Sequence, residues 1–340
     1  MPIAAIFDCE GPRLSDEERA FFRDADPWGF IVFARHCASA EALRAHCDEL
    51  RECVGRADAP ILIDQEGGRV ARMRPPVFPA HPAPAVFGEL LKLDPKKAGE
   101  ASYLNGYLLG RLVSDHGVTV NCMPMLDVPQ PDADPSVIGD RAYAKNAGDI
   151  ERLARRAMEG LMDGGALPVI KHLPGHGRAL CDSHLELPRV GARRDDLAAV
   201  DFSPFCGFRD APMAMTAHVL YEDIDPDEPA TTSKTVIDRI IRGDIGFDGL
   251  LMSDDLKMKA LGGSLAQRAE KALAAGCDIA LCCNYDLEEK TAAAAVVPAL
   301  EGAAATRAQS ALAAARQADD RETAPLYEEL ANLLKPVLVA

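Results

Sequence analysis

The chain has 340 residues, a length that fits one large domain or two small ones, and its apolar and charged fractions are ordinary for a globular protein. The formal net charge of −16 argues against a nucleic-acid partner and against binding to an anionic membrane, because both require a basic surface. The ten cysteines are irregularly spaced and include no CxxC pair, so the usual disulfide frameworks and zinc signatures are excluded.

The first residues lack a basic segment and reach Asp8 after only a few apolar positions, which predicts neither a signal peptide nor a membrane span. No later stretch resembles a transmembrane helix. Cysteines without a disulfide pattern suit a reducing compartment. We therefore expect a cytoplasmic protein.

Eight short apolar runs, rich in Val, Ile, Leu and Ala, recur along the chain. Near-continuous apolar runs predict strands that are buried on both faces, as in a parallel sheet. The runs are Ile3–Phe7, Gly29–Phe33, Pro60–Ile63, Val118–Leu126, Leu167–Ile170, Pro212–Ala217, Gly249–Met252 and Asp278–Cys282.

Stretches with helical periodicity and more charge lie between most of these runs. Several begin with a capping residue, such as Ser39 and Ser264, and Asp94 precedes a proline at the first helical position. The expected helices are Ser15–Asp24, Ser39–Val54, Pro95–Asp115, Asn146–Met162, Ser233–Arg242 and Ser264–Ala275.

A polar residue stands at or just past the carboxyl end of every apolar run. In a (β/α)8 barrel these ends converge on one mouth, where the active sites of this fold lie. No GxGxxG motif follows the first run, which weakens the alternative of a doubly wound dinucleotide-binding sheet. The sequence thus predicts one α/β domain over residues 1–340. Its TIM barrel would cover about residues 1–300, and a helical segment would cover 301–340.

The stretch Pro168–Pro188 is the strongest candidate for a functional site. It begins as a buried strand and breaks at Pro174 and Gly175 into a loop. A loop on a buried strand that carries so many titratable side chains is typical of a catalytic or binding site. Those in this stretch are Lys171, His172, His176, Asp182 and His184.

Four further motifs follow predicted strands and bring carboxylates, guanidinium groups and histidine to the same mouth. This lining suits a hydroxyl-rich ligand, because each sugar hydroxyl both donates and accepts hydrogen bonds. An alternative is that the charged residues of the first motif (Asp64, Glu66, Arg69 and Arg72) form only a surface ion-pair network. The motifs are Asp64–Arg72 (DQEGGRVAR), Ile138–Arg141 (IGDR), Thr216–His218 and Ser253–Met258.

Taken together, KHLPGHG…DSH, DQEGGRVAR, IGDRAY and GFDGLLMSDDLKM resemble glycoside hydrolase family 3. The pattern is most similar to the one-domain bacterial β-N-acetylglucosaminidases (β-hexosaminidases) of cell-wall recycling. The match runs from about Ile3 to Asn284 in the same order. Two positions depart from the family pattern: Leu173 stands where Phe is usual, and Ala142 stands where Ser is common.

The resemblance implies a retaining exo-β-N-acetylglucosaminidase that acts on muropeptide fragments without a cofactor or metal. Asp254 would be the nucleophile that forms a covalent glycosyl intermediate, and His184 would be the general acid/base, paired with Asp182. The protein would be a monomer or weak homodimer. The residues that would bind the terminal N-acetylglucosamine are Asp64, Arg72, Arg141, Lys171 and His172.

Three alternatives remain open at this point. A metal-dependent hydrolase could use histidines of the site, although their spacing fits no zinc signature and Lys171 would repel a cation. Its ligands would be His172, His176, Asp182, His184 and His218. A sugar-binding barrel without turnover would be expected to lack the DSH or SDD residues. A family 3 glucosidase or xylosidase would differ in specificity alone.

Overall fold

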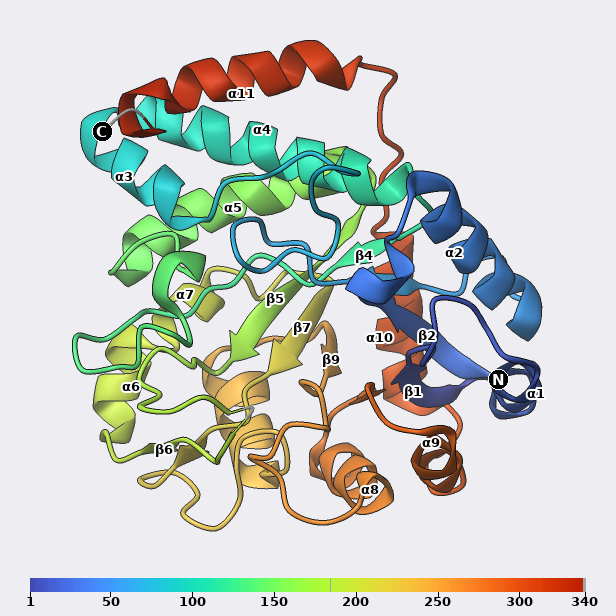
Figure 1. The fold of residues 1–340 in the computed structure, drawn as a ribbon. Coiled ribbons are helices and arrows are strands. Elements are labelled where there is room, and N and C mark those ends of the chain that lie inside the picture. The colour runs from blue at the N-terminus through green and yellow to red at the C-terminus, as the bar shows by residue number, and fades with distance from the viewer. Residues whose placement is uncertain (184, 339–340) are drawn as a thin grey trace.

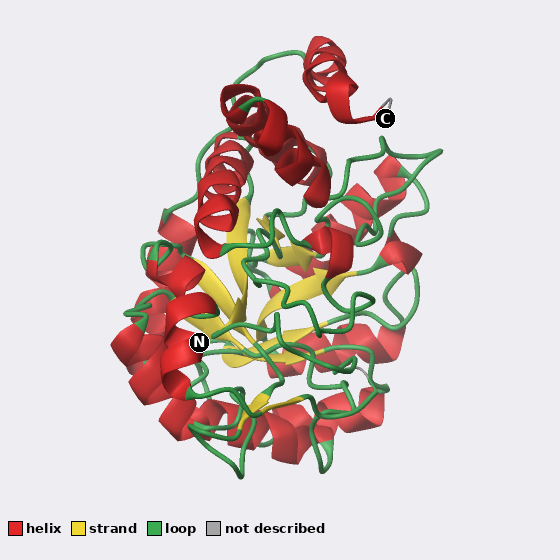
Figure 2. Ribbon diagram, turned by 90° about the vertical axis from the view of Figure 1, so that its left-hand side faces the viewer, coloured by secondary structure: helices red, strands yellow, loops and turns green. Residues whose placement is uncertain are grey.

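Eight parallel strands form the centre of the computed structural model, which describes residues 1–183 and 185–338. Helices surround these strands, so Figures 1 and 2 show the predicted (β/α)8 barrel. The ring is closed between its first and last members by a parallel bridge from Met252 to Ile279. In sheet order the strands are β10 (Ala280–Cys282), β1 (Ile3–Phe7), β2 (Pro27–Val32), β3 (Ile61–Ile63), β4 (Val120–Asn121), β5 (Leu167–Leu173), β7 (Met213–Thr216) and β9 (Leu250–Met252).

Strand β4 is much shorter than the predicted run Val118–Leu126. Pro124 interrupts the run, because proline has no N–H to donate to a neighbouring strand. Pairing resumes at Met125, which forms a parallel bridge with Lys171. The segment after β4 therefore reaches the mouth beside β5 as irregular chain.

Strand β5 is longer than predicted, because it ends at Leu173 instead of Ile170. Lys171 and His172 consequently lie in the strand, where they are 2% and 7% exposed. A buried lysine or histidine is costly unless it is paired, and both of these side chains contact carboxylates in the segments that follow β3 and β4.

All six helices expected between the strands are present, one of them as a π-helix. The two longest of these helices, which contain Gly106 and Gly160, pack closely because each glycine faces the backbone of the other helix. A Cβ at Gly106 would lie 2.2 Å from Ala157 O, and one at Gly160 would lie 2.0 Å from Tyr103 O. The helices are α1 (Asp16–Ala25), α2 (Ala40–Val54), α4 (Pro95–Ser114), α5 (Ala147–Asp163), the π-helix (Val236–Asp244) and α8 (Leu265–Ala275).

Several short elements were not predicted. Helix α3 contains Gly88, which disfavours a helix in isolation, but a Cβ there would lie 1.9 Å from Tyr143 O. The glycine is therefore required by packing. The other elements of this kind are α6 (Arg194–Val200), α7 (Ser203–Cys206) and the parallel pair β6 (Arg189–Val190) and β8 (Leu220–Tyr221), and α3 spans Ala85–Leu93.

The last helices are α9 (Leu287–Ala294), α10 (Gly302–Ala313) and α11 (Thr323–Leu338). Helix α10 packs near β9, whereas α11 lies along α4 and α3 at the top of Figure 1. The predicted boundary near residue 300 stays a prediction. Within the described part of the chain, no helix is long and apolar enough to cross a membrane.

Candidate active site

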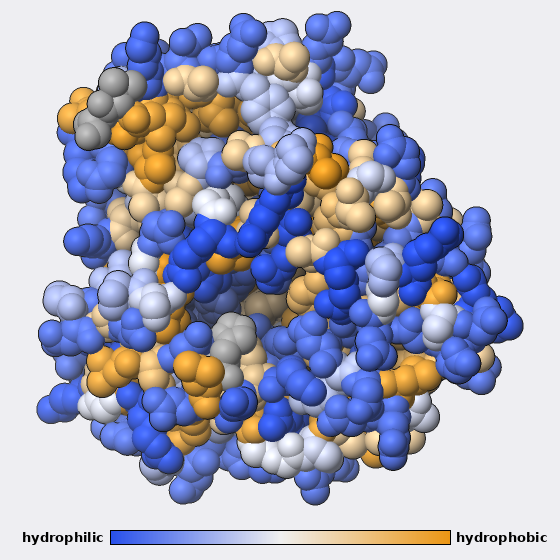
Figure 3. All heavy atoms as spheres, in the orientation of Figure 1, coloured by the Kyte–Doolittle hydropathy of each residue, from blue (hydrophilic) through white to orange (hydrophobic). Residues whose placement is uncertain are grey.

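A pocket of about 350 Å³ lies at the carboxyl ends of the barrel strands. In Figure 3 the centre of this face is hollowed and bordered mainly by hydrophilic residues. The structure brings seven of the eight predicted site residues together in its lining, and the eighth, His184, lies outside the described residues. The seven are Asp64, Arg72, Arg141, Lys171, His172, Asp182 and Asp254.

Two carboxylates and three cations form a connected network on one side of the pocket. Lys171 Nζ lies 3.0 Å from Asp64 Oδ1 and 2.7 Å from Glu66 Oε1. Arg141 donates to both oxygens of Glu66, from Nη2 at 2.8 Å and from Nε at 3.0 Å. Arg72 Nη2 lies 3.1 Å from Asp64 Oδ2. With both carboxylates ionised, the network carries one positive charge in excess.

The charge states of the network follow from these pairs. Burial alone would raise the pKa of Glu66, but the charges of Arg141 and Lys171 outweigh it and lower the pKa to about 2. The same balance, with Lys171 and Arg72 as the cations, holds the pKa of Asp64 well below its usual range. Burial would lower the pKa of Lys171, but Glu66 and Asp64 raise it. All these groups are therefore charged at neutral pH.

The alternative of a surface ion-pair network fits only one ion pair of the Asp64–Arg72 motif. Arg69 pairs with Asp140, and both side chains are exposed. Glu66, by contrast, is buried beneath the pocket. For most of the motif the surface interpretation is therefore wrong.

Replacing Glu66 by Gln is expected to lower the free energy of unfolding by about 3–5 kcal/mol, because two buried cations lose their shared anion. Glu66 has a folded-state pKa of about 2 against an ordinary value of 4.5. Its contribution is therefore fully present above about pH 4.5 and is lost as pH falls towards 2. Urea unfolding across this pH range should show the difference between parent and variant shrinking with falling pH.

The control for this measurement is Asp140→Asn, which removes one member of an exposed pair and should cost no more than about 1 kcal/mol. If Glu66→Gln lowers the free energy of unfolding by the same amount at neutral pH and at pH ~3, the ionised, paired state of Glu66 is contradicted.

Asp127 follows β4 and orients two histidines, a role that the sequence did not assign to it. Its Oδ2 lies 2.6 Å from His172 Nδ1, and its Oδ1 accepts the backbone N–H of His176 at 2.6 Å. Because Nδ1 of His172 donates to this carboxylate, Nε2 is the ring nitrogen left for a ligand in the pocket. His176 in turn lies 3.2 Å from Ser183 Oγ, measured from its Nε2.

The loop after β5 passes close to the segment after β4. A Cβ at Gly177 would lie 1.9 Å from Val128 O, so only glycine allows this approach. The loop then returns with Asp182 and Ser183 in the pocket lining. The predicted acid/base His184 comes next, and its place lies outside the described residues.

Asp254 and Asp255 follow β9 and differ in environment. Burial would raise the pKa of Asp254, but the imidazoles of His218 and His172 and the backbone N–H of Asp255, 2.8 Å from Oδ1, bring it below its ordinary value. The Asp255 carboxylate instead accepts the N–H of Lys257 at 2.8 Å, and burial raises its pKa to about 6. Both residues line the pocket, but Asp254 is the more readily ionised.

His218 is a second residue whose role the sequence did not assign. Its Nδ1 lies 2.7 Å from Thr231 Oγ1, and its Nε2 lies 3.0 Å from the backbone oxygen of Asp255. It thereby fixes the turn that carries Asp254. The signal for His218, as for Asp127, was its position at a strand end.

The metal-dependent alternative receives no support from the described part of the pocket. Among the described residues, the side chains placed to share an ion are Cys9, His36 and His46, which are not pocket residues. His172 and His218 are instead held by Asp127 and Thr231.

The fold and the pocket define a (β/α)8-barrel enzyme with a charged site at the carboxyl ends of its strands. The model of the "Glycosyl hydrolase family 3 N terminal domain" matches residues 6–316. The chain belongs to glycoside hydrolase family 3.

Relatives agree with this assignment. A β-hexosaminidase of Alkalilimnicola ehrlichii is 41% identical over 281 residues, which cover 81% of this chain and 79% of the relative. A β-hexosaminidase of Thiobacillus denitrificans is 36% identical and covers 82% and 78%. The structure of NagZ from Neisseria gonorrhoeae in complex with N-trifluoroacetyl-D-glucosamine has a TM-score of 0.80 and 29% identity, and covers 99% of this chain and 98% of that one.

Proposed function

We propose that this glycoside hydrolase is a retaining exo-β-N-acetylglucosaminidase. It removes terminal, non-reducing β-linked N-acetylglucosamine through a covalent glycosyl-Asp254 intermediate. The observation that carries the proposal is a carboxylate of lowered pKa, Asp254, in the same pocket as the cation-rich network around Lys171. The β-hexosaminidase names of the relatives and the N-acylglucosamine in the NagZ complex support this specificity.

Asp254 is the nucleophile of this proposal. A retaining glycosidase needs an ionised carboxylate on one face of the anomeric carbon and an acid/base on the other. The Asp255 amide and the nearby imidazoles favour the anionic form of Asp254, and its place directly after β9 fixes its direction. When glycosylation neutralises this carboxylate, the excess positive charge of the network remains to hold the sugar.

The charged network binds the sugar. Its carboxylate oxygens accept and its guanidinium and ammonium groups donate, which matches the mixed character of sugar hydroxyls. Arg72 lines the pocket beside Asp64, so its guanidinium is placed to donate to a ligand there. His172 contributes Nε2 as an oriented acceptor or donor, held by Asp127.

His184 is the general acid/base of the proposal, and Asp182 orients its ring. Asp182 lines the pocket, on the loop that follows β5. A histidine with an ordinary pKa of about 6.5 serves both the protonation and the deprotonation step near neutral pH. Unlike a second carboxylate, it is neutral after giving up its proton and does not repel Asp254.

Muropeptide cell-wall fragments are the proposed natural substrates, and the proposed compartment is the cytoplasm. The ten cysteines are free thiols, which suits a reducing compartment. We further propose that residues 1–340 act as one domain, as a monomer or weak homodimer.

The specificity is tested with two chromogenic substrates. The protein should release p-nitrophenol from its β-N-acetylglucosaminide and not from its β-glucoside. Faster hydrolysis of the β-glucoside or the β-xyloside would overturn the proposed sugar and favour a family 3 enzyme of other specificity.

Arg141→Ala and Lys171→Ala are expected to raise KM and lower kcat, because hydrogen bonds to charged groups contribute roughly 1.5–3 kcal/mol each. The loss of one contact of this size corresponds to about a 10–150-fold decrease in kcat/KM. The matched control is Arg316→Ala, whose guanidinium pairs with Asp163 on the exposed surface. Parent-like kinetics in both pocket variants would show that the network does not contact the sugar.

A further inference from the structure

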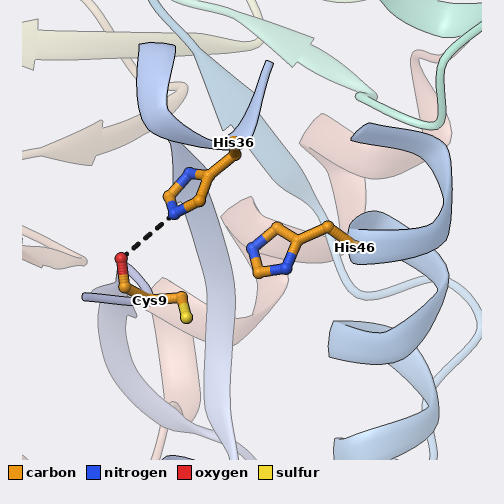
Figure 4. Close-up of side chains that lie close together, drawn as sticks. All are labelled: Cys9, His36 and His46. Atoms are coloured by element: carbon orange, nitrogen blue, oxygen red, sulfur yellow. Dashed lines mark hydrogen bonds between the residues drawn. The ribbon is translucent and has the colours of Figure 1, made fainter. Parts of the chain in front are cut away.

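We propose that Cys9, His36 and His46 form a structural binding site for Zn²⁺ or a cation of the same borderline-soft class. The site is distinct from the sugar pocket and independent of the proposed specificity. Cys9 follows β1, His36 closes the short helix Ala34–His36 after β2, and His46 lies in α2. Figure 4 shows the two imidazole rings and the cysteine side chain gathered between these elements.

The three side chains offer ligand atoms that lie within 4.8 Å of one another, and each residue is at most 2% exposed. The central observation is His46. Both of its ring nitrogens are buried and have no hydrogen-bond partner among the described residues. A buried imidazole normally hydrogen-bonds, and a metal ion would satisfy one of these nitrogens. Thiolate and imidazole are the ligands that zinc prefers.

Burial lowers the pKa of His46 to about 4 and that of His36 to about 3, so both rings are neutral and offer a lone pair at pH 7. Burial and the neighbouring Glu18 raise the pKa of the Cys9 thiol well above its usual range, so this ligand is protonated until the ion binds. The Cys9 thiol donates to Glu18 Oε2 at 3.2 Å. When the ion binds, the thiol proton is released to solvent and a sulfur–metal bond forms. The thiolate and the Glu18 carboxylate then balance the two positive charges.

Local adjustment is needed at both rings. They stack with centroids 4.6 Å apart, so their in-plane lone pairs do not converge. No hydrogen bond among the described residues fixes the orientation of the His46 ring, so its adjustment breaks none. His36 accepts the Phe33 N–H at Nδ1 (2.9 Å), and its Nε2 donates to the backbone oxygens of Cys9 (3.1 Å) and Gly11 (3.0 Å). To ligate through Nε2, the ring must move its proton to Nδ1 and lose all three of these contacts, so we expect His36 to be the weakest of the three ligands.

The ion would fix one side of the barrel mouth. Arg35, next to His36, donates from Nη2 to the Cys9 backbone oxygen at 2.8 Å, and its guanidinium lies over the ring of Phe33, a pocket-lining residue. A metal that joins Cys9 to α2 would therefore hold the loops after β1 and β2 against each other.

The test is a titration of chelator-treated, dialysed full-length protein with Co²⁺, followed by Zn²⁺. One Co²⁺ per chain should give the near-ultraviolet charge-transfer band of a cobalt–thiolate bond. Zn²⁺ should then displace it and raise the Tm. The thiolate band separates this site from metal bound to histidines alone. Absence of the band or of stoichiometric binding in the parent protein would overturn the proposal.

Variants assign the ligands. Cys9→Ser and His46→Leu should each abolish the band and the zinc-dependent rise in Tm, and His36→Gln should weaken binding less. Cys53→Ser is the matched control. This thiol is buried like that of Cys9 and lies in α2 like His46, but it donates to Arg19 O. A band that survives in Cys9→Ser, or that disappears in Cys53→Ser, would contradict the assignment. If His46→Leu does not fold, the titrations of the parent protein and of Cys9→Ser still show whether the ion binds at Cys9.

Discussion

Asp254→Ala is expected to abolish turnover, with a loss in kcat on the order of 10⁴–10⁶-fold, the range found when a nucleophile is removed from other hydrolases. The loss follows because the other described carboxylates of the pocket are placed differently. Asp64 is paired with Lys171 and Arg72, and Asp255 is held by Lys257 and Asn284. Asp182 lies on the loop after β5 and not at the end of β9. The measurement is kcat for p-nitrophenyl β-N-acetylglucosaminide in a variant shown to be folded.

The neighbouring carboxylate supplies the matched control. Asp255→Asn keeps an oxygen that can accept the Lys257 N–H, so the turn after β9 should be retained. We expect this variant to keep most of the parent's turnover. Loss of turnover in Asp255→Asn together with a nearly active Asp254→Ala would transfer the role to Asp255.

His184→Ala is expected to lose on the order of 10²–10⁴-fold in rate on substrates with poor leaving groups, the usual contribution of general acid catalysis. The loss should be much smaller for glycosylation from p-nitrophenyl or dinitrophenyl glycosides, because these leaving groups need little protonation. Asp182→Asn should show a milder form of the same pattern, since a carboxylate that orients an imidazole also favours its protonated form.

The measurement is a series of aryl β-N-acetylglucosaminides that differ in leaving-group pKa. Leu185→Ala is the control on the same loop, because Leu185 is exposed, and it should affect all substrates little. A His184→Ala loss that is equal across the series, under conditions where glycosylation limits the rate, would remove His184 from the acid role.

The barrel was predictable because its strands are locally encoded. Each of the eight strands overlaps one of the predicted apolar runs, and the helix caps at Ser39 and Ser264 were visible as residue types. Errors arose where tertiary packing overrides local preference. Gly88 sits inside α3 because the backbone of Tyr143 approaches it, and nothing in the local sequence indicates that approach.

The sequence predicted seven described residues that line the pocket, but it did not predict the contacts between them. Glu66 and Arg141 are 75 positions apart, and their bidentate pair depends on the barrel bringing β3 and the loop after β4 together. The same reason explains why Lys171 could not be placed inside β5: the carboxylates that permit its burial belong to another strand end. The orphaned nitrogens of His46 likewise have no signature in the sequence.

The covalent intermediate on Asp254 is the central claim, and trapping it is the most direct test. The protein would be incubated with an activated 5-fluoro derivative of N-acetylglucosamine, which slows hydrolysis of the glycosyl-enzyme, and then digested and analysed by mass spectrometry. The account predicts one adduct, on the peptide that contains Asp254 and at that residue, and none in Asp254→Ala. An adduct at Asp255 would contradict the nucleophile assignment. No adduct, together with tight inhibition by an oxazoline analogue, would contradict the covalent mechanism in favour of substrate assistance.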